Sequence, residues 1–212
     1  MIARVVARYT GHDYEVRLES GEVQAAKVSG AFEYTAACAA DFPAIGDMVE
    51  LSPDGMIQRV LPRQSVISRQ MVGKETAEQV LAANVDLVLL VFGLDGFRNF
   101  SQGMLERLLV LVYNSGAVPA IVLNKLDCAE QDHIAGVRAA VDAAAPGVAV
   151  CTCSAIAGQG LEQVKALIKP GKTACFLGRS GVGKSTIING LLGDQVAKAS
   201  QVSRGQNKGR HT

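Results

Sequence analysis

A glycine-rich segment near the C-terminal end has the residue types and spacing of a phosphate-binding loop. Residues 178–185 read Gly-Arg-Ser-Gly-Val-Gly-Lys-Ser, which fits the pattern G-x-x-x-x-G-K-[ST]. Glycines let such a loop curl until successive backbone N–H groups point at one phosphate chain. Lys184 would then reach the β- and γ-phosphates, and the Ser185 hydroxyl would bind Mg²⁺. We expect the phosphate contacts to come from Gly178, Arg179, Ser180, Gly181, Val182, Gly183, Lys184, Ser185 and Thr186.

A second motif, Asn124-Lys125-Leu126-Asp127, matches the guanine-reading pattern N-K-x-D. Guanine presents N1–H and an exocyclic N2–H₂ on one edge, and the Asp127 carboxylate can accept from both. Adenine has neither donor there, so an adenine nucleotide would leave this carboxylate unpaired. Asn124 would face the acceptor side of the base, and the Lys125 stem would lie along the ring. An ordinary polar loop is the alternative for this tetrapeptide taken alone.

A third element, Ser154-Ala155, directly follows an apolar run ending at Cys153. A backbone N–H in such a pair can donate to guanine O6. Alone the dipeptide is weak evidence for a binding site, but all three motifs follow predicted strands. The carboxyl ends of parallel strands are where doubly wound sheets bind ligands. The sequence therefore predicts that three separate loops converge on one nucleotide. The alternative for residues 178–185 is a glycine-rich turn before a helix.

The elements that would position these loops follow from hydrophobic periodicity. From residue 85 onward, continuous apolar runs alternate with helical spacing, which is typical of a parallel sheet covered by helices. Strands are predicted over residues 85–92, 118–123, 148–153 and 173–177. Helices are predicted between them and after the last, with the first capped by Ser101 and the last running from Lys184 to Leu192 and closed by Gly193. Residues 1–63 instead alternate with period two over short segments, which predicts a small β-barrel.

The order of the three motifs is unusual, because the phosphate loop normally comes first in a GTPase. Circular permutation explains this order, since a sheet tolerates new termini where the old ones can be joined. With the strand-rich start and the segment Pro43-Ala-Ile-Gly-Asp-Met-Val49, the arrangement resembles the circularly permuted GTPases of the RsgA (YjeQ) family. The tail Gly209-Arg-His-Thr212 is similar to the start of that family's switch segment.

The resemblance implies an OB-type barrel over residues 1–63, a connector over 64–84 and a circularly permuted α/β P-loop GTPase domain over 85–212. It further implies GTP and GDP as ligands with Mg²⁺, and hydrolysis of GTP to GDP and phosphate. The small ribosomal subunit and its rRNA would be the partners, in late subunit maturation in the cytoplasm. His211 would be the catalytic residue that acts on water, and Thr212 a further possible Mg²⁺ ligand beside Ser185.

The chain also departs from the family pattern. No aspartate begins a D-x-x-G motif, and nothing resembles the family's C-terminal zinc-binding region. We therefore expect the chain to stop inside the switch, with the GTPase domain incomplete and hydrolysis impaired. The strand over 173–177 would then form a sheet edge. Zinc is expected only in that missing region, since the five cysteines include no C-x-x-C pair.

Composition excludes several other classes. The longest apolar runs, such as 87–92, are far shorter than the ~18 residues of a membrane span, and the N-terminus has no secretion signal. Residues 170–212 hold seven basic residues against one acidic residue, whereas residues 1–63 hold six against nine. Charge therefore does not mark the barrel as a nonspecific RNA binder, and we expect neither DNA nor a membrane as a partner.

Two functions are alternatives to a ribosome-associated GTPase. One is a nucleotide-gated rRNA-binding assembly module, in which hydrolysis is incidental. The other is an ATP-using enzyme, which Asp127 disfavours.

Overall fold

In the computed structural model, the described residues are 1–70, 78–96 and 99–193. Their contacts divide the chain into two units. The first consists of Met1–Asp86 with Leu111–Ala117, and the second of Leu87–Val110 and the chain from Val118 on. Among the described residues, no helix combines the length and the apolar character needed to cross a membrane.

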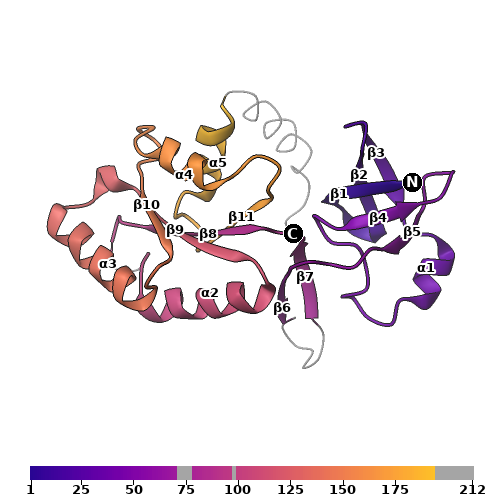
Figure 1. Cartoon of the computed structure of the whole chain (residues 1–212), viewed down its shortest axis with the longest axis horizontal. Coiled ribbons are helices and arrows are strands. Elements are labelled where there is room, and N and C mark those ends of the chain that lie inside the picture. Colours follow the sequence, from indigo (N-terminus) through magenta and orange to yellow (C-terminus); the bar gives the residue numbers. More distant parts are fainter. Residues whose placement is uncertain (71–77, 97–98, 194–212) are drawn as a thin grey trace, which may run out of the picture. The chain divides into compact units, whose positions relative to one another are not determined.

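A five-stranded antiparallel sheet dominates the first unit, with the strand order β3-β2-β1-β4-β5 (Figure 1). Its strands are β1 Ile2–Arg8, β2 Asp13–Leu18, β3 Val23–Lys27, β4 Met48–Leu51 and β5 Ile57–Val60. The alternation seen in the sequence places Tyr14 and Val16 in the core, where both are almost completely buried. An isolated parallel bridge joins Val28 to Ile57, so the two outermost strands of the sheet also approach each other.

Three further parts of this unit were not predicted as elements. A six-residue helix, α1 Gly30–Thr35, follows β3, and its N-terminus is capped by the Ser29 hydroxyl, which accepts from Phe32 N at 3.2 Å. The predicted connector, residues 64–84, contains an antiparallel pair, β6 Val66–Gln70 and β7 Glu78–Ala83. A three-residue 3₁₀ turn, Thr10–His12, joins β1 to β2.

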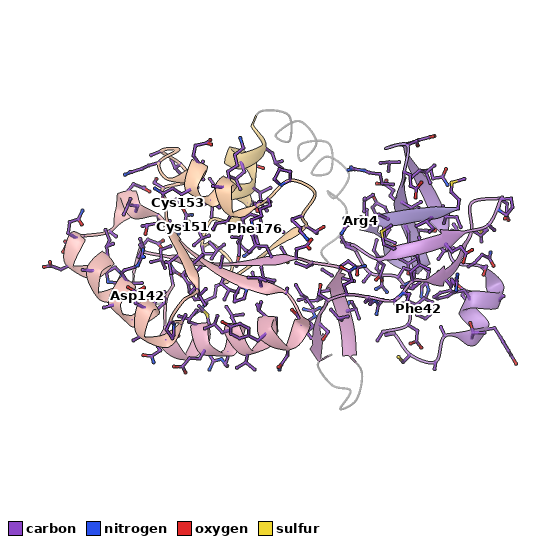
Figure 2. All side chains as sticks on the ribbon, viewed as in Figure 1. Arg4, Phe42, Asp142, Cys151, Cys153 and Phe176 are labelled. Carbon is purple, nitrogen blue, oxygen red and sulfur yellow. The ribbon has the colours of Figure 1, made fainter. Side chains whose placement is uncertain are left out.

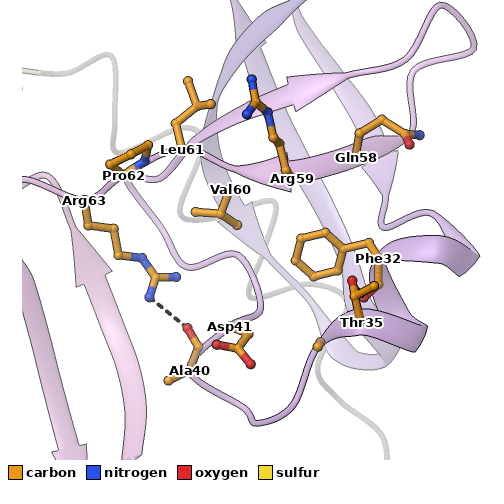
Figure 3. Close-up of a pocket in the computed structure, with 11 residues that line it drawn as sticks. Phe32, Thr35, Ala40, Asp41, Gln58, Arg59, Val60, Leu61, Pro62 and Arg63 are labelled. Carbon is orange, nitrogen blue, oxygen red and sulfur yellow. Dashed lines mark hydrogen bonds between the residues drawn. The ribbon is translucent and has the colours of Figure 1, made fainter.

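A buried ion pair joins the loop before β4 to the segment that follows β5. Asp47 is fully buried, and its carboxylate accepts two hydrogen bonds from Arg63 at 2.7 and 2.8 Å and one from Ala44 N at 2.8 Å. Arg63 also donates to the carbonyls of Ala40 and Phe42. The guanidinium therefore has partners for several of its donors, as a charge in such a position requires. Figure 3 shows Arg63 and Ala40 at the rim of a pocket of about 470 Å³, which is lined by α1, β5 and the intervening loop.

The second unit contains a four-stranded parallel sheet with the order β10-β9-β8-β11. Its strands are β8 Leu87–Gly93, β9 Val118–Asn124, β10 Ala149–Thr152 and β11 Ala174–Leu177. Its helices are α2 Gln102–Ser115, α3 Gln131–Ala144, α4 Leu161–Leu167 and α5 Lys184–Leu192, with a 3₁₀ turn over Leu126–Cys128. The strand and helix positions predicted from residue 85 onward are thus confirmed to within a few residues at each end.

Helices cover both faces of this sheet. α3 and the N-terminal part of α2 lie on one side, and α4 and α5 on the other (Figure 1). On the α4–α5 side, Leu89, Val122 and Ile187 belong to one buried cluster. Cys151 and Cys153 belong to the same cluster and alternate along and just beyond β10 (Figure 2). The continuous apolar runs of the sequence are explained by this burial on both faces.

The chain changes direction in the sheet after β10. It runs outward from β8 through β9 to β10, and then returns past β8 to form β11. The helices that follow β8 and β11 lie on opposite faces, so the loops after these two strands diverge. In doubly wound sheets a crevice forms at such a point, at the carboxyl ends of the strands. The four strand ends at this edge lead into the three predicted motifs and into the loop that begins at Leu94.

Candidate nucleotide-binding site

The glycine-rich loop curls tightly between β11 and α5. Gly178, Gly181 and Gly183 have φ values of +153°, +84° and +97°, which side chains with a Cβ rarely adopt. A Cβ at Gly178 would also overlap the carbonyl oxygen of Val91 in β8. A Cβ at Gly183 would overlap Nδ2 of Asn124, so both glycines are required by a close approach as well as by backbone geometry. The loop leaves a cradle that glycine alone permits.

Lys184 and Ser185 open α5, with Gly183 as the N-cap residue. The Lys184 ammonium donates to the carbonyls of Gly178 at 2.8 Å and Arg179 at 2.7 Å, so it lies over the loop. Ser185 and Thr186 are exposed in the first helical turn. The N-terminal end of a helix carries partial positive charge and uncommitted N–H groups, which favour an anion. The lysine, the helix end and the cradle therefore fit a phosphate chain, and the exposed Ser185 hydroxyl supplies an oxygen donor suited to Mg²⁺.

Asn124 connects all three motifs. It ends β9 and is only 2% exposed. Its Nδ2 donates to the carbonyl of Val182 at 2.9 Å, and its Oδ1 accepts from Ala155 N at 3.0 Å. The thiol of Cys153 lies 3.4 Å from the same oxygen. One buried side chain thus joins the Asn-Lys-Leu-Asp loop to the glycine-rich loop and to the Ser-Ala loop.

A backbone N–H of the Ser154-Ala155 pair, such as that of Ala155, was predicted to donate to guanine O6. In this structure the Ala155 N–H donates to the Asn124 side chain instead, and the Asn124 amide donates to the protein backbone. A base that accepts from Ala155 N would have to displace the Asn124 oxygen. This contact between the Ser-Ala pair and Asn124 could not be inferred from sequence spacing, and donation to guanine O6 stays a prediction.

Asp127 and Ser154 are brought together from different loops. The Ser154 hydroxyl, which is buried, donates to Asp127 Oδ1, and the Cys128 thiol lies 3.1 Å from Oδ2. Chiefly because of the hydrogen bond from Ser154, the pKa of Asp127 is held below its usual value. The carboxylate, which is exposed, therefore stays ionised and its direction is set by the serine. The sequence singled out both residues but did not predict this contact between them.

Lys125 has an unusual backbone. Its φ of +68° and ψ of +40° place it in the left-handed region, which is uncommon for a residue with a side chain. Its ammonium forms an ion pair with Asp95, in the loop after β8. Asp95 was not predicted as a site residue, because it stands about thirty positions before the motif and follows no pattern. His211 and Thr212 lie outside the described residues.

Comparison with known proteins identifies a family and several similar proteins. The family model described as RsgA GTPase matches residues 60–212. A relative in Lactiplantibacillus plantarum named small ribosomal subunit biogenesis GTPase RsgA 2 is 38% identical over 216 residues, covering 100% of this chain and 59% of the relative. A relative of that name, without the number, in Opitutus terrae is 40% identical over 205 residues, covering 91% and 54%.

Two solved structures are similar over most of the chain. YjeQ from Thermotoga maritima superposes with a TM-score of 0.71 at 29% identity, covering 90% of this chain and 64% of the other. YloQ, described as a circularly permuted GTPase, gives a TM-score of 0.64 at 26% identity, covering 89% and 63%. The chain thus spans a little more than half the length of the curated relatives it matches, 59% and 54% in the two cases given. On the family match and these identities, the chain belongs to the RsgA GTPase family.

Proposed function

We propose that this chain binds guanine nucleotides with Mg²⁺ and acts as a GTPase in maturation of the small ribosomal subunit. The observation that carries the nucleotide site is the double hydrogen bonding of Asn124, which joins the phosphate loop and the Ser-Ala loop to the Asn-Lys-Leu-Asp loop. Three segments separated by up to 58 positions meet at this side chain. Such convergence at the carboxyl edge of a parallel sheet is what a mononucleotide site requires.

Base selection rests on Asp127. Its ionised carboxylate would accept from N1–H and N2–H₂ of guanine, while the Ser154 hydroxyl keeps one of its oxygens oriented. An adenine base offers no donor at that edge, so the carboxylate would be covered without a partner. Guanine nucleotides are therefore favoured over adenine nucleotides.

Phosphate binding rests on the residues around the cradle. A diphosphate lying on the glycine-rich loop would draw the Lys184 ammonium away from the Gly178 and Arg179 carbonyls, since a phosphate oxygen is the stronger acceptor. The α5 N-terminus lies behind it. Mg²⁺, held by Ser185 and phosphate oxygens, would neutralise charge on the phosphates during transfer to water. His211 as the group that orients this water, and Thr212 as a further metal ligand, remain proposals from the family resemblance.

The first unit is proposed to be an OB-type barrel. Its strand order, the parallel bridge between Val28 and Ile57, and the placement of α1 between β3 and β4 support a five-stranded sheet that closes on itself. Barrels of this type bind nucleic acids in many proteins, which is consistent with rRNA as a contact. The relatives' names specify the small ribosomal subunit, and a protein that acts on it would work in the cytoplasm.

Nucleotide titration tests the site. Isothermal calorimetry should give micromolar binding of GDP and no measurable binding of ADP. Asp127→Asn should weaken GDP binding and favour xanthosine diphosphate, whose extra carbonyl matches the amide's N–H donors. The matched control is Asp132→Asn, an exposed aspartate at the start of α3, which should leave GDP binding unchanged. Equal binding of ADP and GDP would contradict the proposal.

Measurement of GTP turnover distinguishes a GTPase from an rRNA-binding assembly module. GTP hydrolysis is measured with and without purified small ribosomal subunits, on a chain extended to the length of the curated relatives. Stimulation by the subunit would support the GTPase. Subunit binding that depends on nucleotide, without any increase in turnover, would instead indicate an rRNA-binding assembly module.

A further inference from the structure

The loop after β8 is held directly against the Asn-Lys-Leu-Asp loop. Gly93, the last residue of β8, pairs in register with Asn124, the last residue of β9. The next residue, Leu94, continues this pairing, because its N–H donates to the Asn124 carbonyl at 2.8 Å. The residue after Leu94 is therefore placed beside the residue after Asn124. These two residues are Asp95 and Lys125.

Asp95 and Lys125 form a partly buried ion pair. The Lys125 Nζ lies 2.5 Å from Asp95 Oδ2, and the two side chains are 24% (Lys125) and 27% (Asp95) exposed. The other carboxylate oxygen, Oδ1, accepts from Asn99 Nδ2 at 2.7 Å. Both oxygens of Asp95 are thus engaged, one by the lysine and one by an amide that keeps the carboxylate in place. A contact of this kind is less screened by solvent than an ion pair on an open surface.

Gly93 makes this arrangement possible. A Cβ on Gly93 would come 2.5 Å from Asp95 Oδ1 and 3.3 Å from Asn99 Cβ. The absence of a side chain therefore lets Asp95 and Asn99 fold back over the strand end. The backbone of Lys125, in the left-handed region, aims its side chain toward the same place. Three independent features, namely a glycine, an amide and a strained lysine, converge on one ion pair.

We propose that Asp95, oriented by Asn99, is a positioning residue that fixes Lys125 so that the lysine stem lies along the face of the bound base. The inference rests on the proposed nucleotide site and extends it to a residue outside the three motifs. A long lysine side chain loses rotamer freedom when it packs against a ligand, and an ion pair already formed removes part of that cost. Asp95 thereby contributes to affinity without touching the nucleotide.

This role has a signature that separates it from base reading. The face of the ring is common to guanine and hypoxanthine, whereas Asp127 distinguishes them through the exocyclic N2–H₂. Substitution of Asp95 is therefore expected to weaken the binding of GDP and the binding of IDP by the same factor. The hydrogen bond from Lys125 also holds the pKa of Asp95 below its usual value, so the ion pair persists at neutral and mildly acidic pH.

A double-mutant cycle on this chain tests the proposal. Asp95→Asn is expected to raise the Kd for GDP and for IDP about fivefold each, which corresponds to about 1 kcal/mol. Lys125→Met keeps an unbranched stem but removes the ammonium, so adding Asp95→Asn to Lys125→Met is expected to have no further effect. Asn99→Ala should give a smaller change in the same direction. Asp132→Asn is the matched control, and thermal unfolding of each variant verifies that it is folded.

The outcomes are distinct. A Kd for Asp95→Asn within twofold of the unaltered chain would overturn the positioning role, as would an equal effect of Asp95→Asn in the Lys125→Met background. A fivefold loss for GDP with none for IDP would also overturn it, because the residue would then be reading the base edge. If the unaltered chain bound neither nucleotide, the proposed function would fail together with this inference, and that result is visible before any variant is made.

Discussion

The side-chain amide of Asn124 donates a hydrogen bond to the backbone carbonyl of Val182, 58 positions later in the chain. Asn124 lies at the end of β9, and Val182 lies in the loop between β11 and α5. In the sheet, β8 lies between β9 and β11. The hydrogen bond therefore passes over the carboxyl end of β8, although β8 contributes neither of the two residues. The same hydrogen bond joins the glycine-rich loop to the Asn-Lys-Leu-Asp loop in the absence of a ligand.

Replacing Asn124 with Ala is expected to destabilise the fold. The Val182 carbonyl would lose its partner in a buried place and the Ala155 N–H in a partly buried one, and an unsatisfied buried group costs about 1–3 kcal/mol. We expect a loss of about 2 kcal/mol or more in the free energy of unfolding, measured by urea denaturation followed by circular dichroism. Asn189→Ala, at an exposed position of α5, should change it by less than about 0.5 kcal/mol. An Asn124→Ala variant as stable as the unaltered chain would show that the two hydrogen bonds of the Asn124 side chain do not stabilise the fold.

Alanine at Gly183 and at Gly181 should have different effects. Both glycines have positive φ, so a Cβ adds about 1–2 kcal/mol of backbone strain at either position. At Gly181 the Cβ would meet nothing within 4 Å, whereas at Gly183 it would overlap Asn124 Nδ2. Gly183→Ala should therefore be more destabilising by at least about 1 kcal/mol in the same denaturation assay. The difference should vanish in the Asn124→Ala background, and its persistence there would show that the Asn124 contact is not its cause.

The sequence was sufficient to locate the loops but not the bonds between them. Residues such as Gly178 and Lys184 could be assigned because a phosphate loop requires fixed spacing, and β8 to β11 because runs buried on both faces are continuous. The ion pair between Asp95 and Lys125 depends on strand register, which aligns Gly93 with Asn124. Register is a tertiary property that no local pattern encodes for parallel strands.

The parts of the fold that sequence reasoning missed are short or irregular. Helix α1 has six residues, too few for a hydrophobic period, and depends on the Ser29 cap and on Phe32 packing into the core of the first unit. The β6–β7 pair contains a register shift between Ile67 and Ser68, which breaks the alternation expected of a strand. In both cases contacts with the rest of the unit override a weak local signal.

Two arginines of the first unit should differ sharply on substitution. Arg63→Met would leave the fully buried Asp47 carboxylate without its counter-charge, which typically costs about 3–5 kcal/mol. Arg59→Met removes an ion pair with Glu50 whose partners are 68% and 41% exposed, and pairs of this kind contribute about 0–1 kcal/mol. Urea denaturation should therefore show a much lower midpoint for Arg63→Met alone. Similar midpoints for the two variants would mean that Asp47 is stabilised by its bond from Ala44 N without the arginine.

The thiol of Cys128 should report on Asp127. Cys38 and Cys128 are exposed, whereas Cys153 is buried and burial raises its pKa to about 11. The hydrogen bond to the Asp127 carboxylate raises the pKa of Cys128. At pH 8 a smaller fraction of Cys128 is therefore present as the reactive thiolate than in an exposed cysteine without this hydrogen bond. Asp127→Asn removes the negative charge, lowers that pKa and should increase the alkylation rate of Cys128 several-fold. The rate is followed by mass spectrometry after iodoacetamide treatment of the native protein.

Cys38 serves as an internal reference whose rate should not change, and Cys153 should stay unmodified. An unchanged Cys128 rate in Asp127→Asn would mean that the Cys128 thiol and the Asp127 carboxylate are not coupled.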